Sequence, residues 1–420
     1  MGMTILDSMD TLYLAGLHEE FAQATQFVSK LNFSSTEPHV HHSFFETTIR
    51  ALGGLMGAYT VSKEPILLQK ALDLGERLYK AVPHAGSKRV WPAAEVSVST
   101  GELVDSGWSG GVILADVGSW GVEFSALGAA SGDLRFQAAA QQGMKHLAQV
   151  AATSRHHLIG MFLSARTNRT TTSRVGVGGC SDSYYEYLLK MWIQGGKKDD
   201  AMLQEWKDAM EEMRAGLLRT TADGTTYLGQ SSAWDFATRR YEEPEPRMDH
   251  LSCFVGGMLA LGHHTVPADR REAWWLPAAR NLTQTCYEMY QMTATGLAPD
   301  QVEFGSGKME PPYGGDPVMF RMRPETLESL FVLHRVTGEE RYRQWSYKIF
   351  EAIQTHAKAA HGYATVRDVR RPRSGHVNTQ ETFVGAETLK YAYLIHLPSD
   401  VLPLDQYVFN TEAHPVPVQA

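Results

Sequence analysis

A pair of helices recurs along the sequence, and this repeat constrains the fold more than any other feature. Each copy has an apolar helix, a polar turn with Gly, Asp or Pro, and a second helix that is apolar on one side only. The expected pairs are 4–16 with 18–31, 44–55 with 67–79, 112–130 with 134–150, 182–194 with 199–218, 249–263 with 268–293, and 324–337 with 340–359. A single last helix is expected at 381–396.

Six pairs and one single helix predict an all-α toroid. The less charged first helices would form its inner layer and the second helices its outer layer. Short strand-like pieces at 158–163, 225–229 and 362–366 follow second helices. An open solenoid of helix hairpins has the same periodicity, so the repeat alone leaves ring and solenoid as alternatives.

The composition excludes several classes of protein. Lys plus Arg is 39 and Asp plus Glu is 47, and the net charge of −8 argues against a nucleic-acid partner. With 43% hydrophobic and 20% charged residues the chain is globular. We expect no membrane span, because no apolar run is long enough, and no signal peptide. The three cysteines, Cys180, Cys253 and Cys286, fit no zinc spacing and are either buried thiols or one bridge plus one spare.

Acidic residues recur at corresponding points of the expected inner helices. They are Glu46, Glu123, Asp182, Asp249 (followed by His250), Glu325 with Glu328, and Glu387. A single one could be a helix cap or a partner for Arg50 or Arg323, since an unpaired buried carboxylate is costly. In a closed ring, however, all of them would converge on one axial cavity. Such a ring of acids suits the binding of a hard cation, or acid and base chemistry on a polyol.

Five longer segments and an opening motif carry a family resemblance. They are 45–55, 182–190, 323–331, 386–391 and 409–415, and the opening motif is 6–12. On these segments the chain resembles the class I α-1,2-mannosidases, glycoside hydrolase family 47, in order from residue 5 to about 417. The resemblance implies an (α/α)7 barrel, a helical toroid plugged by a C-terminal β-hairpin. We therefore expect one catalytic domain over 1–420, with the hairpin at 402–418.

The resemblance also implies a reaction, the calcium-dependent removal of terminal α-1,2-linked mannose with inversion at the anomeric carbon. By motif match Glu46 is the general acid, acting through a water, and Glu325 is the base. Asp182 is the third catalytic carboxylate, and whether Asp182 or Glu325 activates the water stays open. Inversion requires carboxyl groups about 6.5–9.5 Å apart.

Other residues of the motifs would bind the ion and the sugar. Thr411 corresponds to the family's direct protein ligand for Ca²⁺, through its hydroxyl and its carbonyl, and water and two mannose hydroxyls would complete the shell. The acids that would hold those waters are Glu123, Glu328, Glu387 and Glu412, with Glu381 a weaker match. The remaining substrate-binding candidates are Arg50 and Arg323, which would orient Glu46 and Glu325; His250, which would hydrogen-bond in the cavity; and Phe383, which would stack on the sugar or else pack in the core.

Cys253 and Cys286 fall where eukaryotic members of the family have a disulfide. If formed, it implies an oxidising compartment, either secreted, periplasmic or the lumen of the secretory pathway. Cys180 stands where some members carry an arginine, which leaves the branch preference open. The chain begins within the first motif of the family, without the helix that usually precedes it, and we expect a monomer.

Two other functions are weighed against the hydrolase. A lectin-like relative would bind mannose glycans without turnover, although all three catalytic carboxylates are present. Another helical-toroid enzyme, such as a sugar epimerase or a different glycosidase, would lack the motif at 409–415.

Overall fold

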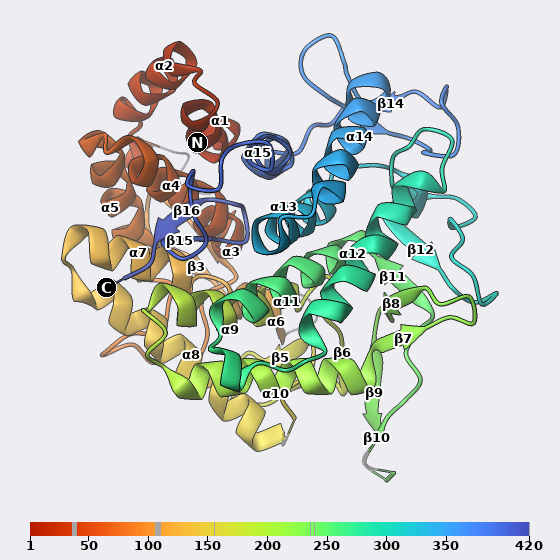
Figure 1. Cartoon of the computed structure of the whole chain (residues 1–420). Helices are drawn as coiled ribbons and strands as arrows, with labels where there is room; N and C mark the ends of the chain where they lie inside the picture. Colours follow the sequence, from red (N-terminus) through yellow and green to blue (C-terminus); the bar gives the residue numbers. More distant parts are fainter. Residues whose placement is uncertain (36–39, 106–110, 155, 236, 239, 420) are drawn as a thin grey trace. The chain divides into compact units, whose positions relative to one another are not determined.

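The computed structural model describes residues 1–35, 40–105, 111–154, 156–235, 237–238 and 240–419 (Figure 1). The chain forms two compact units. Unit 1 comprises Met1–Val175, Cys180–Glu212 and Asp405–Ala420, and unit 2 comprises Gly176–Gly179 and Met213–Leu404. No helix within the described ranges is long and apolar enough to cross a membrane.

Unit 1 has two layers of helices. The first members of the pairs are α1 (Met3–Leu14), α4 (Gly53–Ser62), α7 (Gly121–Ser131) and α9 (Asp182–Gln194). The second members are α2 (His18–Ser29), α5 (Pro65–Tyr79), α8 (Leu134–Ser154) and α10 (Asp200–Gly216), whose last turn belongs to unit 2. Helix α1 packs on α4, α4 on α7 and α7 on α9. All of α9 after Asp182 is buried, whereas α5 buries one face only, so the first members are the inner layer.

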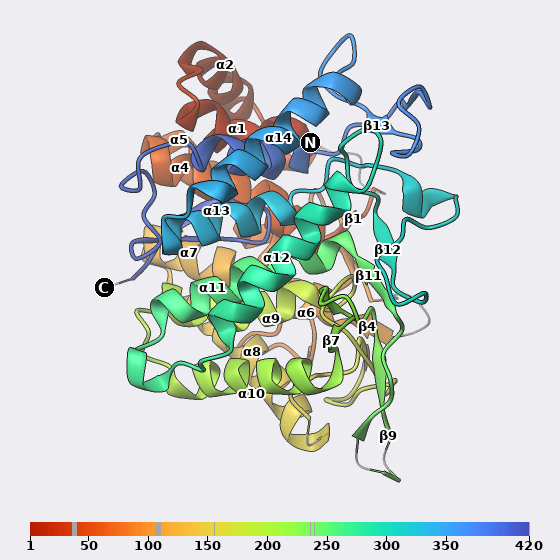
Figure 2. The ribbon, with the colours of Figure 1, turned by 45° about the vertical axis from the view of Figure 1, so that its right-hand side comes forward.

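Unit 2 repeats this arrangement. Its inner helices are α11 (Phe254–Thr265), α13 (Glu325–Thr337) and α15 (Leu389–Leu394), and its outer helices are α12 (Trp275–Gln291) and α14 (Glu340–His356). Helix α13 packs against α11, α14 and α15, and α11 packs against α12. Figure 2 shows α11, α12, α13 and α14 side by side.

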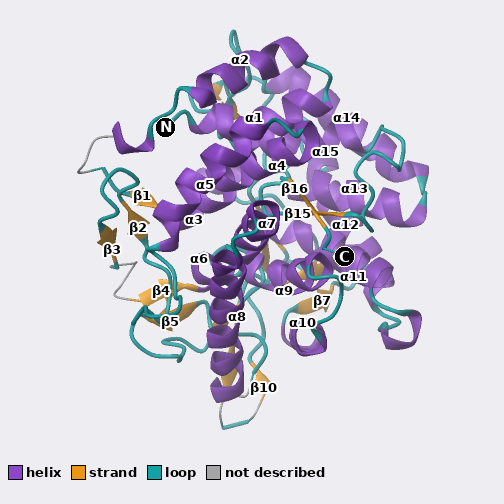
Figure 3. Cartoon of the chain, turned by 90° about the vertical axis from the view of Figure 1, so that its left-hand side faces the viewer, coloured by secondary structure: helices purple, strands orange, loops and turns teal. Residues whose placement is uncertain are grey.

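The strands are short and alternate with helices along the chain (Figure 3). In unit 1 they are β1 (His42–Ser43), β2 (Glu95–Val96), β3 (Leu103–Val104), β4 (Gly111–Ile113), β5 (Phe162–Ser164), β6 (Arg174–Val175), β15 (Tyr407–Phe409) and β16 (Pro415–Pro417). In unit 2 they are β7 (Leu218–Thr220), β8 (Thr226–Leu228), β9 (Ser232–Asp235), β10 (Arg240–Tyr241), β11 (Arg247–Asp249), β12 (Gln301–Glu303), β13 (Thr365–Val366) and β14 (His376–Val377). Antiparallel pairs are β1 with β2, β2 with β3, and β4–β5, β7–β8, β9–β10, β11–β12, β13–β14 and β15–β16.

Short helical segments precede or interrupt several long helices. They are η1 (Phe33–Ser35), α3 (Phe44–Glu46), the π-helix η2 (Thr47–Leu52), α6 (Leu114–Gly118), the 3₁₀ turns η4 (His250–Cys253), η5 (Ala268–Arg270) and η6 (Asp316–Val318), and the π-helix η7 (Val384–Thr388). Both π-helices fall in segments that carry the sequence motifs. Wide turns of this kind are frequent at functional sites.

The hairpin β15–β16 packs on α4, α7 and α9 of unit 1. Its His414 is fully buried, with Nε2 3.0 Å from Asp7 Oδ1 and Nδ1 2.9 Å from Asp10 Oδ2. Gly54 allows α1 to approach α4, because a Cβ there would lie 2.2 Å from the carbonyl oxygen of Leu6. The N-terminal helix, α4 and the hairpin are therefore packed as one block.

Several predicted helices begin later than expected. The helix expected at 112–130 is divided into β4, α6 and α7, because the chain breaks at Ser119 and Trp120 before α7 begins. The helix expected at 268–293 begins at Trp275, and Pro277 lies in its first turn, where no N–H is needed. The helix expected at 249–263 begins at Phe254, after β11 and η4.

Candidate functional site

Glu46 and Arg50 lie at the π-turn that opens the second inner helix. Ser43 Oγ accepts a hydrogen bond from the Glu46 backbone N–H at 3.2 Å and caps this turn. Arg50 Nε donates to Glu46 Oε2 at 2.5 Å. The Glu46 side chain is 45% exposed, so its carboxylate is accessible while one oxygen is held.

Arg50 is shared by three carboxylates of unit 1. Its Nη1 lies 2.8 Å from Glu412 Oε1 and 3.6 Å from Asp7 Oδ2. Burial tends to lower the pKa of Arg50, but the charges of Glu412, Glu46 and Asp7 outweigh it and raise that pKa. Burial raises the pKa of Glu412 to about 8, against the opposing charge of Arg50. The guanidinium thus joins the general-acid candidate to the hairpin.

Glu123 is fully buried in the first turn of α7. Its Oε1 accepts hydrogen bonds from the Tyr187 hydroxyl at 2.6 Å and from Asn410 Nδ2 at 2.7 Å. The Tyr187 oxygen in turn accepts one from the Thr411 backbone N–H at 3.3 Å. Burial raises the pKa of Glu123 to about 7, although the bonds from Tyr187 and Asn410 lower it. Glu123 and Thr411 are therefore linked through one hydroxyl.

Two buried carboxylate oxygens in this network lack partners. Oε2 of Glu123 and Oε2 of Glu412 accept no hydrogen bond from any residue that the structure describes. Each of these acids makes its bonds through the other oxygen. Buried polar atoms are nearly always satisfied, so ordered water is the expected partner of these two oxygens.

Asp182 is the first residue of α9 and is partly exposed. Its Oδ1 accepts a hydrogen bond from the Ser183 N–H at 2.9 Å. Cys180, two residues earlier, has a φ of 77° and accepts a bond from the Ala115 N–H at 3.0 Å through its carbonyl. The left-handed residue fixes the direction in which the chain enters α9.

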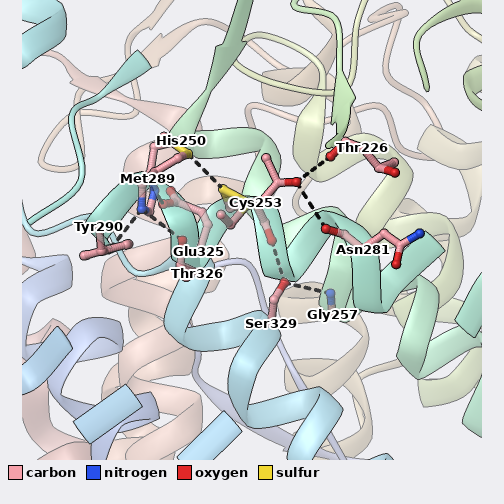
Figure 4. The surroundings of a disulfide bond; sticks show 12 residues. Thr226, His250, Cys253, Gly257, Asn281, Met289, Tyr290, Glu325, Thr326 and Ser329 are labelled. Atoms are coloured by element: carbon pink, nitrogen blue, oxygen red, sulfur yellow. Dashed lines mark hydrogen bonds and ion pairs between the residues drawn. A yellow bond between two sulfur atoms is a disulfide. The ribbon is translucent and has the colours of Figure 1, made fainter. Parts of the chain in front are cut away.

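Glu325 opens α13 in unit 2 and is paired with His250 (Figure 4). His250 is 1% exposed, and its Nδ1 lies 2.8 Å from Glu325 Oε2. Its Nε2 lies 2.9 Å from the Tyr290 hydroxyl and 3.1 Å from Thr326 Oγ1. Both ring nitrogens are engaged, so the imidazole holds one orientation against the carboxylate.

Arg323 is partnered differently from the expectation. Instead of pairing with Glu325, its Nε donates to Asp300 Oδ1 at 3.0 Å, and Arg321 Nε donates to Asp300 Oδ2 at 2.8 Å. Burial lowers the pKa of Arg323, but the nearby charges of Asp300 and Glu325 raise it overall. Arg323 therefore lies within electrostatic reach of Glu325, while its hydrogen bond goes to Asp300. Asp249 is held by the side-chain amides of Gln230 at 3.1 Å and Gln301 at 2.5 Å.

The remaining predicted residues lie at the motif positions of unit 2. Glu328 is one turn after Glu325 on α13 and is partly exposed. Glu387 is buried within the π-helix η7. Phe383 directly precedes this helix and is partly exposed. Thr388 Oγ1 donates to the carbonyl of Met322 at 2.5 Å, which ties η7 to the segment that precedes Glu325.

Cys253 and Cys286 form a disulfide, as predicted, between η4 and α12 (Figure 4). Cys253 lies three residues after His250 on the same 3₁₀ turn. Cys180 is the free cysteine, so the three thiols form one bridge and one spare.

Several residues of these networks were not found from the sequence. They are Asp7, Asp116, Tyr187, Tyr290, Asp300 and Asn410. Asp7 and Asn410 lie inside recognised motifs and could have been found there. Burial, with the charge of Glu46 second, raises the pKa of Asp116 to about 6. Tyr290 lies on α12 and Asp300 directly precedes β12, and no local spacing predicts that they reach these partners.

Comparisons with known proteins point to one family over almost the whole chain. The model of glycosyl hydrolase family 47 matches residues 1–418. The endoplasmic reticulum mannosyl-oligosaccharide 1,2-alpha-mannosidase of Homo sapiens is 36% identical over 432 residues, covering 100% of this chain and 58% of that protein. The chain spans about three fifths of the length of such relatives. A second example is the human mannosyl-oligosaccharide 1,2-alpha-mannosidase IB, of whose length the chain covers 63%.

Solved structures give the same result. The alpha-1,2-mannosidase from Trichoderma reesei matches with a TM-score of 0.87 and 26% identity, over 100% of this chain and 90% of that one. A cellobiose 2-epimerase from Spirochaeta thermophila matches with a TM-score of 0.65 at 14% identity, over 86% and 88% of the two chains, and so shares only the fold. The match to the Trichoderma reesei enzyme confirms the (α/α)7 fold class that the family resemblance implied. The chain belongs to glycosyl hydrolase family 47.

Proposed function

We propose that the chain is an exo-acting α-1,2-mannosidase that hydrolyses terminal α-1,2-linked mannose with inversion. The observation that carries this proposal is that, in a family 47 chain, two motif carboxylates each have a fixed partner. Arg50 Nε lies 2.5 Å from Glu46, and His250 Nδ1 lies 2.8 Å from Glu325. The relatives are named as 1,2-alpha-mannosidases acting on mannosyl-oligosaccharides.

The proposed reaction is one displacement at the anomeric carbon. The bond from that carbon to the bridging oxygen breaks, and the oxygen takes a proton that Glu46 delivers through a water. A second water attacks from the opposite face and passes its proton to Glu325 or to Asp182. The proposal treats residues 1–420 as one catalytic domain.

Each proposed catalytic residue has local contacts that suit its role. Arg50 keeps one Glu46 oxygen engaged and leaves the accessible side of the carboxylate for the water. His250, fixed by Tyr290 and Thr326, presents Glu325 in a single orientation. Asp182 is the first residue of α9, and its Oδ1 is held by the Ser183 N–H at 2.9 Å.

A calcium ion fits the residues around Thr411. The proposed donors are all oxygen, the kind of ligand that Ca²⁺ prefers. Within the described ranges no group of three or more His, Cys, Asp and Glu side chains could hold a metal ion, so waters would complete the shell. The unpartnered oxygens of Glu123 and Glu412 would hold those waters, as would Glu328 and Glu387. When bound, the ion would supply charge that orients the hydroxyls of the mannose.

The other proposed contacts are to the sugar. Phe383 would stack on the apolar face of the mannose ring, and Arg323 would set the field around Glu325. The Cys253–Cys286 disulfide supports an oxidising compartment, secreted or within the lumen of the secretory pathway.

Incubation with α-1,2-linked mannobiose tests the proposal. We expect mannose release in calcium and its loss with a chelator, with the β-anomer appearing first in the NMR spectrum, as inversion requires. Binding of the disaccharide without any release in calcium would establish the lectin-like alternative instead. Release of the α-anomer first would overturn the inverting mechanism.

A further inference from the structure

A pocket of about 530 Å³ lies in unit 1 at the C-terminal end of α9. Its walls come from α7, α8, the end of α9, the turn that leads to α10, and the chain after β16. Asp182 begins α9 and Gln194 ends it, and 12 residues of helix correspond to about 18 Å. The pocket is thus at the opposite end of this helix from the proposed catalytic aspartate.

Four glutamines dominate the chemistry of the pocket: Gln137, Gln141, Gln194 and Gln419. A primary amide offers donors and an acceptor side by side, which suits the alternating hydroxyls of a sugar. An apolar ligand could form no hydrogen bond with these amides. The lining therefore selects a polyhydroxylated ligand over a lipid-like one.

In this lining Gln194 is held by short hydrogen bonds, whereas the side chains of Gln137 and Gln419 make only long ones. Gln194 is 1% exposed, its Nε2 donates to the Val122 carbonyl at 2.9 Å, and its carbonyl accepts from the Gln419 N–H at 2.7 Å. By contrast, Gln137 Nε2 lies 3.4 Å from Gln419 Oε1, and Gln419 Nε2 lies 3.5 Å from the Ser125 carbonyl. Bonds of that length are weak, so these amides can exchange them for ligand hydroxyls.

The charges and the apolar surface of the lining further restrict the kind of ligand that fits the pocket. Lys198, Asp199 and Asp200 contribute one positive and two negative charges to the lining, an excess that disfavours phosphates and carboxylates. Met202, which is partly exposed, supplies apolar surface on which the C–H face of a pyranose can lie. The volume is in the range of small-molecule sites.

We propose that this pocket is a second carbohydrate site, which binds a neutral mono- or disaccharide apart from the proposed catalytic residues. The proposal does not depend on hydrolytic activity. It would let the protein hold one arm of a branched glycan, or a second glycan, while another arm is processed.

Binding in this pocket can be measured by NMR of the protein labelled with ¹³C at the methionine methyl groups, because Met202 lines the pocket. The signal of Met202, assigned with Met202→Leu, is recorded while methyl α-D-mannopyranoside is added to about 100 mM. We expect a saturable shift of this signal. Gln141→Leu should weaken the affinity at least about fivefold, as for a lost hydrogen bond. Gln142→Leu, the neighbouring glutamine outside the lining, should leave it unchanged.

Three outcomes would overturn the proposal. The first is a Met202 signal that stays fixed throughout the titration. The second is an equal affinity in the Gln141→Leu and Gln142→Leu variants. The third is tighter binding of mannose 6-phosphate than of the neutral glycoside. Each is read at Met202, so failure of this proposal is distinguishable from failure of mannose release.

Discussion

His250 Nδ1 lies 2.8 Å from the Oε2 atom of Glu325, and a buried tyrosine and threonine hold the other side of the imidazole. The pair joins β11 and η4 to the first residue of α13 within unit 2. A carboxylate held in this way keeps one orientation. Its proposed role as a base can therefore be tested by a substitution that keeps the shape of the side chain.

Replacement of Glu325 should abolish turnover while the fold survives. Glu325→Gln keeps the shape of the side chain and removes its basicity, so kcat should fall at least about 100-fold. Mannose release from the α-1,2-linked disaccharide measures this, with the melting temperature as a check on folding. Glu351→Gln, an exposed acid on α14, is the matched control. Near-normal turnover in Glu325→Gln would remove the residue from the mechanism.

Glu46→Gln should also lower kcat at least about 100-fold, because the proposed acid can no longer deliver a proton. The loss should be smaller for substrates with an acidic leaving group, such as an aryl mannoside, which need little protonation. Glu64→Gln, at the exposed N-cap of α5, is the control. An equal loss on both kinds of substrate would contradict the assignment of Glu46 as the acid.

Thr411→Ala should weaken calcium binding at least about tenfold, because the hydroxyl is a proposed ligand of the ion. Isothermal calorimetry measures the affinity, and the rise of the melting temperature on adding calcium gives a second readout. Thr411→Ser keeps the hydroxyl and should restore most of the affinity. Unchanged affinity in the alanine variant would refute the ligand assignment.

Loss of the disulfide should destabilise the protein. Closing the 33-residue loop is worth about 3–4 kcal/mol in the chain-entropy model. The double variant Cys253→Ala, Cys286→Ala should therefore unfold at a clearly lower denaturant concentration, whereas Cys180→Ala, which removes the free thiol, should not. Equal midpoints for the two variants would show that the bridge adds no stability.

His157 should make stability depend on pH. The hydrogen bond that His157 donates to Glu205 raises the pKa of His157, burial opposes this, and the charges of Glu212 and Asp208 add to the rise. A raised pKa gives stability that is present below the unfolded value of about 6.5 and is lost as pH rises through the folded value. His157→Gln should thus lower the melting temperature more at about pH 5.5 than at about pH 8.5. Exposed His361→Gln should show no such difference, and an equal loss at both pH values would contradict the prediction.

The sequence predicted helices best where the apolar pattern is uninterrupted. Helix α9 has the predicted bounds, and α13 begins one residue later than expected. The prediction was wrong where a glycine and an aromatic residue end a helix inside an apolar run. The stretch before α7 is the clearest case, since Gly118 and Trp120 permit a break that hydrophobicity alone does not reveal.

The site was predictable where partners are close in sequence. Glu46 and Arg50 are four residues apart on one helix, and their pairing was predicted. Arg323 instead pairs with Asp300, 23 residues earlier, and His250 meets Tyr290, 40 residues later. Such contacts depend on how β12 and α12 return to the inner helices, which helical periodicity does not encode.

The hydrogen bonds of His414 to Asp7 and Asp10 span 407 and 404 residues. During synthesis, His414 therefore emerges from the ribosome 407 residues after Asp7 and 404 residues after Asp10. Until then these two acids lack the imidazole, although Asp7 can already meet Arg50. Many nascent chains fold domain by domain, but unit 1 cannot be completed before the hairpin emerges. Its completion is a late step, and a polypeptide released before residue 414 would lack the hairpin that unit 1 is built around.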